Sequence, residues 1–158
     1  MKAKSPQLKL RLDAATPDPA ARWCDGAPLA HLGEALILRL DSHRKEAVVE
    51  GEELHLPLPP EATPRQVQDA AESWLRARAL RVMSLQVVME ARRLGRPAPP
   101  VSLSFAGRAS WVRPDDRGGL RFHWRLVEQA PEVIAQVVAR ALAELPVTVE
   151  TPDLFAFA

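Results

Sequence analysis

Only one cysteine, Cys24, occurs in the 158 residues, and this scarcity excludes several kinds of site. No disulfide can form within the chain, and no zinc or iron–sulfur centre with several cysteine ligands can be built from it. A chain without disulfides is typical of a reducing compartment, which predicts a cytoplasmic location. No stretch approaches the roughly 20 apolar residues of a membrane-spanning helix. Lys9, Arg11 and Asp13 interrupt the N-terminal segment, so no secretory signal is predicted either.

An excess of charge of one sign is also lacking. Lys and Arg number 21 against 20 Asp and Glu, which leaves a formal charge of +1. The composition therefore makes no overall electrostatic case for a nucleic acid or a membrane as partner. Arginines nevertheless concentrate along residues 65–96 and again along residues 108–125, with Trp111 and Trp124 in the second group. Nucleic-acid binding through these arginines, with bases stacked on the tryptophans, is an alternative that the sequence leaves open.

Motifs for nucleophilic catalysis are missing too. There is no Gly-x-Ser-x-Gly turn, and nothing near Cys24 in the sequence would lower the pKa of its thiol. The four histidines stand at positions 31, 43, 55 and 123, so no two of them are three or four residues apart. Histidines scattered in this way do not form a metal-binding pair on one helix.

The order of elements that is present predicts an α+β fold, with an antiparallel or mixed sheet packed against two helices. A long helix is predicted over about residues 63–94, because Thr63 and Gln66 form a capping box around Pro64. A second helix is predicted over about residues 131–145, between Pro131 and Pro146. Strands are predicted around residues 8–12, 35–40, 47–50, 53–58, 101–105 and 120–124. Residues 1–22 are predicted to be a flexible arm and residues 23–158 a single domain.

Apolar residues on the two helices predict how they pack. The second half of the long helix is apolar nearly all round, which predicts that a sheet and the second helix enclose it. Those residues are Leu80, Met83, Leu85, Val87, Val88 and Met89. The second helix carries a single apolar stripe at helical spacing, which predicts one buried face. That stripe consists of Val133, Ile134, Val137, Val138, Ala141, Leu142 and Leu145.

Three segments together resemble one known family. The first is LPLPPEAT over residues 56–63, running into WLRARAL over residues 74–80. The second is Ser110-Trp111 followed by GLRFHWRLV over residues 119–127, and the third is APEVI over residues 130–134 followed by Val137-Val138. In order and spacing they resemble the YgjP-like metallopeptidase domain, a bacterial family related to SprT-type and other small gluzincins. The similarity spans roughly residues 24–145.

The resemblance implies a zinc-binding motif that this chain lacks. In the family the third segment continues into His-Glu-x-x-His, where two histidines hold zinc and the glutamate activates a bound water. The matching positions here are Arg140, Ala141 and Glu144. The family's third ligand lies beyond this helix, and none of the thirteen residues after Leu145 is histidine. The chain is therefore interpreted as a degenerate member, truncated after the zincin helix, with no catalytic residue and no zinc or other cofactor.

The leading hypothesis is a catalytically inactive homologue that acts as a binding or regulatory module for an unknown protein or peptide, and not for a membrane. Trp111, His123 and Arg125 are the candidate residues on the substrate side, while Arg140 and Glu144 could form an ion pair across one helical turn. The alternative is a metal-dependent hydrolase or peptidase with a site rebuilt around Glu144 and His123. A second alternative is nucleic-acid binding through the arginines.

Overall fold

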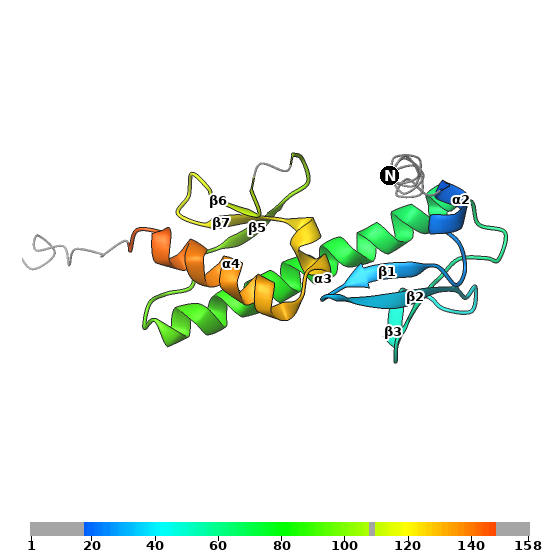
Figure 1. Cartoon of the computed structure of the whole chain (residues 1–158), viewed down its shortest axis with the longest axis horizontal. Coiled ribbons are helices and arrows are strands. Elements are labelled where there is room, and N and C mark those ends of the chain that lie inside the picture. Colours follow the sequence, from blue (N-terminus) through cyan, green and yellow to red (C-terminus); the bar gives the residue numbers. More distant parts are fainter. Residues whose placement is uncertain (1–17, 108–109, 148–158) are drawn as a thin grey trace, which may run out of the picture. The chain divides into compact units, whose positions relative to one another are not determined.

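The computed structural model describes residues 18–107 and 110–147, which belong to two compact units, Met1–Leu75 and Arg76–Ala158 (Figure 1). The predicted strand around residues 8–12 lies outside the described residues. A short helix, α2 (Pro19–Arg22), falls within the segment predicted to be an arm. The predicted boundary between residues 22 and 23 stays a prediction.

The first unit contains a four-stranded mixed sheet in the order β1-β2-β4-β3. Strand β1 (Pro28–His31) pairs antiparallel with β2 (Glu34–Leu40), and β2 pairs parallel with β4 (Glu53–Leu56). Strand β3 (Val48–Glu50) forms the predicted hairpin with β4, and Gly51 in its turn has a φ of 60°, a conformation that favours glycine. Strand β1 was not predicted, because its four residues contain a proline and show no clear alternation.

The long helix α3 (Pro64–Arg93) begins and ends where the sequence predicts. The amide of Gln66 donates to Thr63 Oγ1 at 3.2 Å, and the amide of Thr63 donates to Gln66 Oε1 at 2.9 Å. This reciprocal pair is the predicted capping box. At the other end Gly95 adopts a φ of 66°, and the amide of Arg96 donates to the carbonyl of Ala91 at 3.0 Å, which closes the helix.

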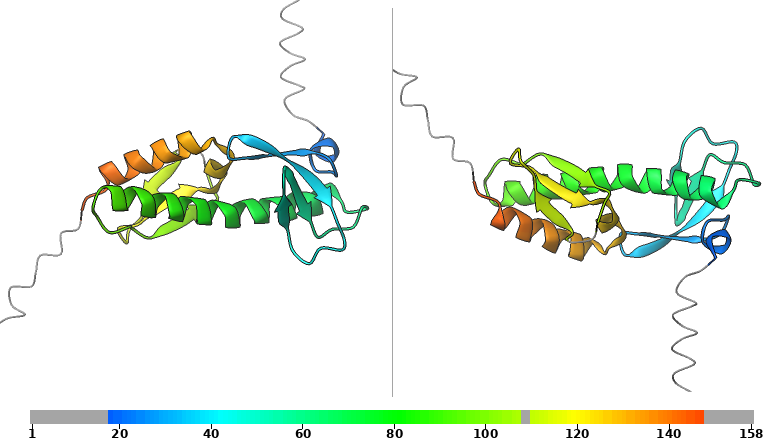
Figure 2. Two further views of the ribbon diagram at one scale, coloured as in Figure 1. Left: turned by 90° about the horizontal axis from the view of Figure 1, so that it is seen from below. Right: turned by 90° about the horizontal axis from the view of Figure 1, so that it is seen from above.

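The second unit contains a three-stranded mixed sheet in the order β5-β7-β6. Strand β5 (Val101–Ser104) runs parallel to β7 (Leu120–His123), and β6 (Val112–Pro114) runs antiparallel to β7. A 3-10 helix over Trp124–Glu128 leads to α4 (Pro131–Glu144), whose ends match the prediction to within one residue (Figure 2). Two mixed sheets with a long and a shorter helix make the fold α+β, as predicted.

The core of the second unit is formed by α3, β7, the 3-10 helix and α4. Its buried apolar residues are Ala79, Met83, Val87, Ala91, Leu120, Phe122, Trp124, Leu126, Val127, Ile134, Val138, Ala141 and Leu142. On α3 these residues recur every fourth position, so a single face of this helix is buried. The buried face of α4 includes four residues of its predicted stripe.

The predicted enclosure of the second half of α3 is wrong. Leu85 and Met89 are 60% and 56% exposed, and Leu80 and Val88 are 43% and 41% exposed. Only Met83 and Val87 of the predicted set are buried, because the neighbouring elements of this unit cover one face of the helix. No helix within the described ranges is long and apolar enough to span a membrane.

Candidate functional site

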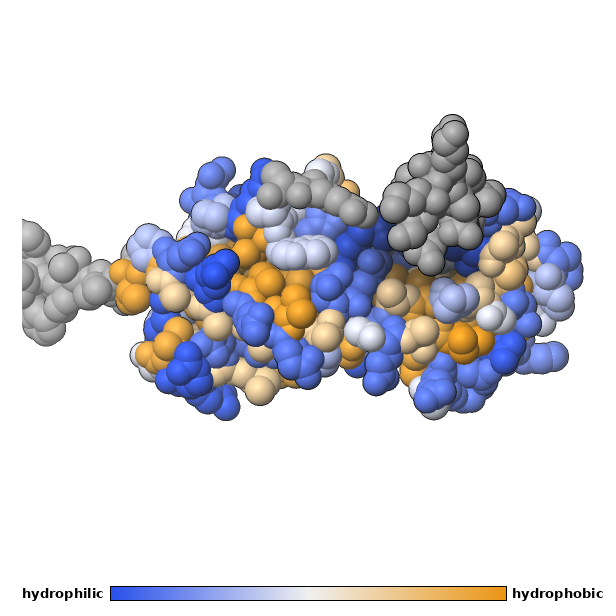
Figure 3. Space-filling view, viewed as in Figure 1, coloured by the Kyte–Doolittle hydropathy of each residue, from blue (hydrophilic) through white to orange (hydrophobic). Residues whose placement is uncertain are grey.

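A groove lies along α4 in the second unit. Its cavity volume is about 730 Å³, within the range of ligand pockets. One wall is α4, from which Val133, Gln136, Val137, Ala139, Arg140, Ala141 and Glu144 line it. These positions recur at helical spacing beside the buried face, so they form a second stripe along the same helix. In Figure 3 apolar surface gathers where α4 and the three-stranded sheet lie in Figure 1.

The opposite wall of the groove is β6 and the two residues before it. Ser110, Trp111 and Val112 line it, and Trp111 is 39% exposed. A second cavity of about 210 Å³, between β6 and the end of α4, shares Val112, Ala141 and Glu144 with the first. The two cavities are therefore contiguous and form one groove between β6 and α4.

Strand β6 is an edge strand of its sheet. The amide of His123 donates to the carbonyl of Trp111 at 2.8 Å, and the amide of Asp115 donates to the carbonyl of Gly119 at 2.9 Å. Hydrogen-bonded pairs alternate with non-bonded ones along an antiparallel ladder, so the amide and carbonyl of Val112 point away from β7, to the open edge. The carbonyl already accepts from Ser110 Oγ at 3.1 Å. Val112 thus offers a backbone donor beside the groove that it lines.

All three positions of the family motif meet at this groove. Arg140 and Glu144 are exposed, and Ala141 is 7% exposed at the floor. The ion pair that Arg140 and Glu144 could form across one turn is absent, since no contact within 4.0 Å joins their charged groups in the described structure. The two opposite charges are therefore both available to a ligand at the rim of the groove.

The substrate-side candidates are only partly brought together. Trp111 lines the groove, and its ring is 6.3 Å from that of His123 in an edge-on arrangement. His123 is 7% exposed and accepts the amide of Arg125 at Nδ1. It lines a separate small cavity, so the structure does not bring it into the groove of Glu144.

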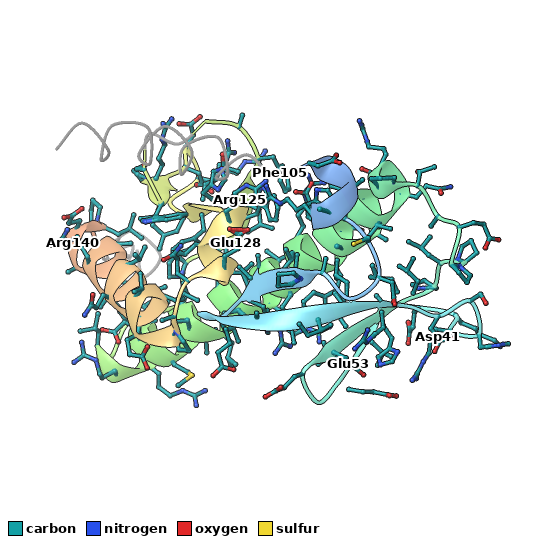
Figure 4. All side chains as sticks on the ribbon, turned by 45° about the vertical axis from the view of Figure 1, so that its right-hand side comes forward. Asp41, Glu53, Phe105, Arg125, Glu128 and Arg140 are labelled. Atoms are coloured by element: carbon teal, nitrogen blue, oxygen red, sulfur yellow. The ribbon has the colours of Figure 1, made fainter. Side chains whose placement is uncertain are left out.

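Arg125 takes part in a stack of cations and aromatic rings. Its guanidinium lies 4.4 Å from the ring centre of Trp124 and pairs with Glu128 at 3.0 Å (Figure 4). Arg76 lies 5.0 Å from the same ring. Because Trp124 is 3% exposed and already in contact with both guanidinium groups, it cannot stack on a nucleic-acid base. This part of the nucleic-acid alternative is wrong.

Sequence reasoning missed Val133 and Val137 as lining residues by placing them in the core. Both are only half-buried, whereas Ile134 and Val138 beside them are buried. The sequence held a signal for this second role. Seven apolar positions in fifteen residues make an apolar face that is wider than packing against the core alone requires. Within residues 18–107 and 110–147, no three His, Cys, Asp or Glu side chains are grouped so as to hold a metal ion.

Asp115 organises the turn that joins β6 to β7. Its Oδ1 accepts the amide of Gly119 at 2.7 Å and the amide of Arg117 at 2.8 Å. These two hydrogen bonds, with smaller contributions from the charges of Arg121 and Arg117, lower the pKa of Asp115 below its ordinary value of 3.8.

We expect Asp115 to make folding stability fall in acid. Its pKa is lower in the native than in the unfolded state, so its contribution is complete above pH 3.8 and is lost as the pH falls through the native pKa. Urea unfolding at a series of pH values measures this loss. Asp115→Asn should lose less stability than the wild type between about pH 5 and pH 3, whereas Asp116→Asn, at an exposed neighbouring position, should follow the wild type. Equal acid sensitivity of all three proteins would contradict the assignment.

Comparison with known proteins agrees with the resemblance seen in the sequence. A family model described as "YgjP-like, metallopeptidase domain" matches residues 4–143. No curated protein and no solved structure gives a significant match. The match covers most of the chain and includes all of β1 to β7 and almost all of α4. This chain belongs to the YgjP-like metallopeptidase domain family.

Proposed function

We propose that this chain is a catalytically inactive member of its family that binds an extended peptide segment in the groove between β6 and α4 without cleaving it. The observation that carries the proposal is that Arg140, Ala141 and Glu144 line an open groove beside an edge strand. The groove supports binding, while the side chains at these positions argue against metal-dependent hydrolysis.

The donor set at the groove does not fit zinc. A guanidinium stays protonated and has no lone pair to give, so Arg140 is not a ligand. Ala141 has neither a metal ligand nor a general base, and Glu144 supplies a single carboxylate. A catalytic zinc typically has three protein ligands, and no histidine or cysteine is among the groove's described lining residues. The groove therefore lacks the ligands for a metal-dependent step.

Three features of the groove favour a peptide as the ligand. The Val112 amide at the open edge can donate to the backbone of an extended segment, as in strand addition to a sheet. The side chains of Val137, Val133 and Ala141 give an apolar floor for a ligand side chain. Trp111 is an exposed aromatic side chain at one wall, a type enriched at binding hot spots. Pro114 has no amide N–H to donate, so a peptide could pair with only a short stretch of β6.

The test is selection of ligands from a library of short random peptides on the immobilised full chain. Selected peptides should bind the wild type and should bind Val137→Glu at least about tenfold more weakly, because a carboxylate would then face the apolar floor. Val49→Glu is the matched control, since Val49 is an exposed valine on β3, in the other unit. Fluorescence anisotropy measures binding, and mass spectrometry of the incubated peptides should find no cleavage.

Metal analysis of the same protein samples completes the test. We expect elemental analysis to find far less than one zinc per chain and a chelator to leave peptide binding unchanged. Near-stoichiometric zinc that the chelator removes and that Glu144→Ala abolishes would overturn the inactive assignment, as would chelator-sensitive cleavage. Equal loss of binding in Val137→Glu and Val49→Glu would place the ligand elsewhere.

A further inference from the structure

Two arginines face each other on the outer side of the three-stranded sheet. Arg113 on β6 and Arg121 on β7 are directly opposite in the antiparallel register, and both are exposed. Alternate residues of a strand point to opposite faces, so these side chains lie on the face away from buried Phe122. Side chains at directly opposite positions have Cβ atoms about 5 Å apart, and like charges there destabilise a sheet.

Neither arginine is neutralised by an acid. Within residues 18–107 and 110–147, no carboxylate lies within 4.0 Å of either guanidinium. The Nε of Arg113 donates to Ser110 Oγ at 3.4 Å, and the guanidinium of Arg121 makes no hydrogen bond to the described part of the chain. Asp115 is close enough to feel the charge of Arg121, but its Oδ1 is held by the amides of the turn. The pair therefore keeps two positive charges and most of its donors.

The same two arginines line a small cavity together with hydroxyl and imidazole groups. Ser104, Ser110 and His123 complete its polar lining, and no acidic residue is among the described residues that line it. Ser104 is next to His123 in the parallel register of β5 and β7, so neighbouring strands supply these groups. The two hydroxyls already donate to the carbonyls of Ala106 and Val112, so the guanidinium groups are the donors that this cavity offers to an oxyanion.

We propose that Arg113 and Arg121 bind a phosphate group at this cavity. Two guanidinium groups match the charge of a phosphate dianion, whereas a carboxylate would neutralise only one of them. The cavity volume is about 20 Å³, room for roughly one water-sized group, so a single phosphate oxygen enters and the rest of the group stays at the surface. Binding removes the repulsion between the facing arginines. The small cavity is distinct from the peptide groove, although Ser110 and Arg113 line both, whereas Arg121 lines only the small cavity.

The phosphate has two possible sources, a monoester or the phosphodiester backbone of a nucleic acid. Isothermal titration calorimetry of the full chain with inorganic phosphate, phosphoserine and a short oligothymidylate separates them. A monoester site should bind the first two at least as tightly as the oligonucleotide. A phosphodiester site should bind the oligonucleotide more tightly, with an affinity that falls steeply with salt. Either pattern supports a phosphate site at this cavity.

The assignment to these two side chains is tested with matched variants. Arg113→Gln and Arg121→Gln should each weaken binding of the preferred probe by about 10- to 100-fold, the loss expected for a charge-assisted bidentate contact. Arg117→Gln, on the adjacent turn but outside the cavity, should leave it unchanged. In phosphate-free buffer Arg121→Gln should unfold at a temperature no lower than the wild type, because like-charge repulsion is relieved.

Three results would overturn the proposal. The first is no saturable binding of any phosphate probe. The second is an equal loss of affinity in Arg117→Gln, which would indicate a diffuse effect of positive charge. The third is binding of acetate as tight as that of inorganic phosphate at equal ionic strength, which would show a site for carboxylates.

Discussion

Replacing Phe122 with alanine should lower the free energy of unfolding by about 3–5 kcal/mol, the usual cost of removing a buried ring. Phe122 is fully buried on the central strand of its sheet, between Leu103 on β5 and Val112 on β6. Its loss leaves a cavity in the core next to Val112, the β6 residue that lines the groove. Because domains of this size are stable by only about 5–15 kcal/mol, the variant should unfold at a much lower urea concentration.

Phe105→Ala is the matched control for this prediction. The Phe105 side chain is 59% exposed, and the guanidinium of Arg76 lies 5.3 Å from its ring centre. Truncating it removes this contact but opens no cavity, so the cost should be no more than about 1 kcal/mol. Urea unfolding followed by circular dichroism compares the two variants. If Phe122→Ala cost no more than Phe105→Ala, the packing described for β7 would be wrong.

Replacing Arg96 with glutamine should destabilise the C-terminal end of α4 by about 1–3 kcal/mol. Arg96 follows α3, and its Nη1 and Nη2 donate to the carbonyls of Leu142 and Leu145 at 2.7 and 3.0 Å. The last carbonyls of a helix have no partner within it, and a cation there also interacts favourably with the helix dipole. One guanidinium therefore secures the end of the helix that carries Glu144.

Amide hydrogen exchange in the last turn of α4 and urea unfolding together measure this effect. Faster exchange in that turn is expected from Arg96→Gln and a smaller increase from Arg96→Lys, since one ammonium cannot reproduce the forked contact. Arg92→Gln is the control, because Arg92 is an exposed arginine in the last turn of α3. Unchanged exchange in Arg96→Gln would show that the two hydrogen bonds contribute nothing to holding α4.

The helices could be predicted from the sequence because local chemistry defines their ends. Thr63, Pro64 and Gln66 form a capping box at the start of α3, and Gly95 ends the same helix through a positive φ. Such signals act within one turn of the chain, so they can be read without knowing the fold. The same holds for the hairpin of β3 and β4, which turns at Gly51.

Strands β1 and β6 and the exposed face of α3 could not be predicted in this way. Strand β6 has three residues, one of them proline, too few to show a period of two. It is a strand because β7 offers a partner for pairing. Leu85 and Met89 were predicted to be enclosed because they are hydrophobic. Hydrophobicity shows which residues can be buried, but the number of neighbouring elements decides which residues are buried.

By itself, the sequence determined the fold class, the extent of both helices, the family and the identities of the side chains at positions 140, 141 and 144. Each of these depends on residue type and on spacing along the chain. Only the tertiary structure decided that those positions line an open groove with Trp111, that His123 lies in a different cavity, and that Arg113 faces Arg121. These residues lie on separate strands and helices. The distances between them depend on strand register and on packing, which act across long stretches of the chain.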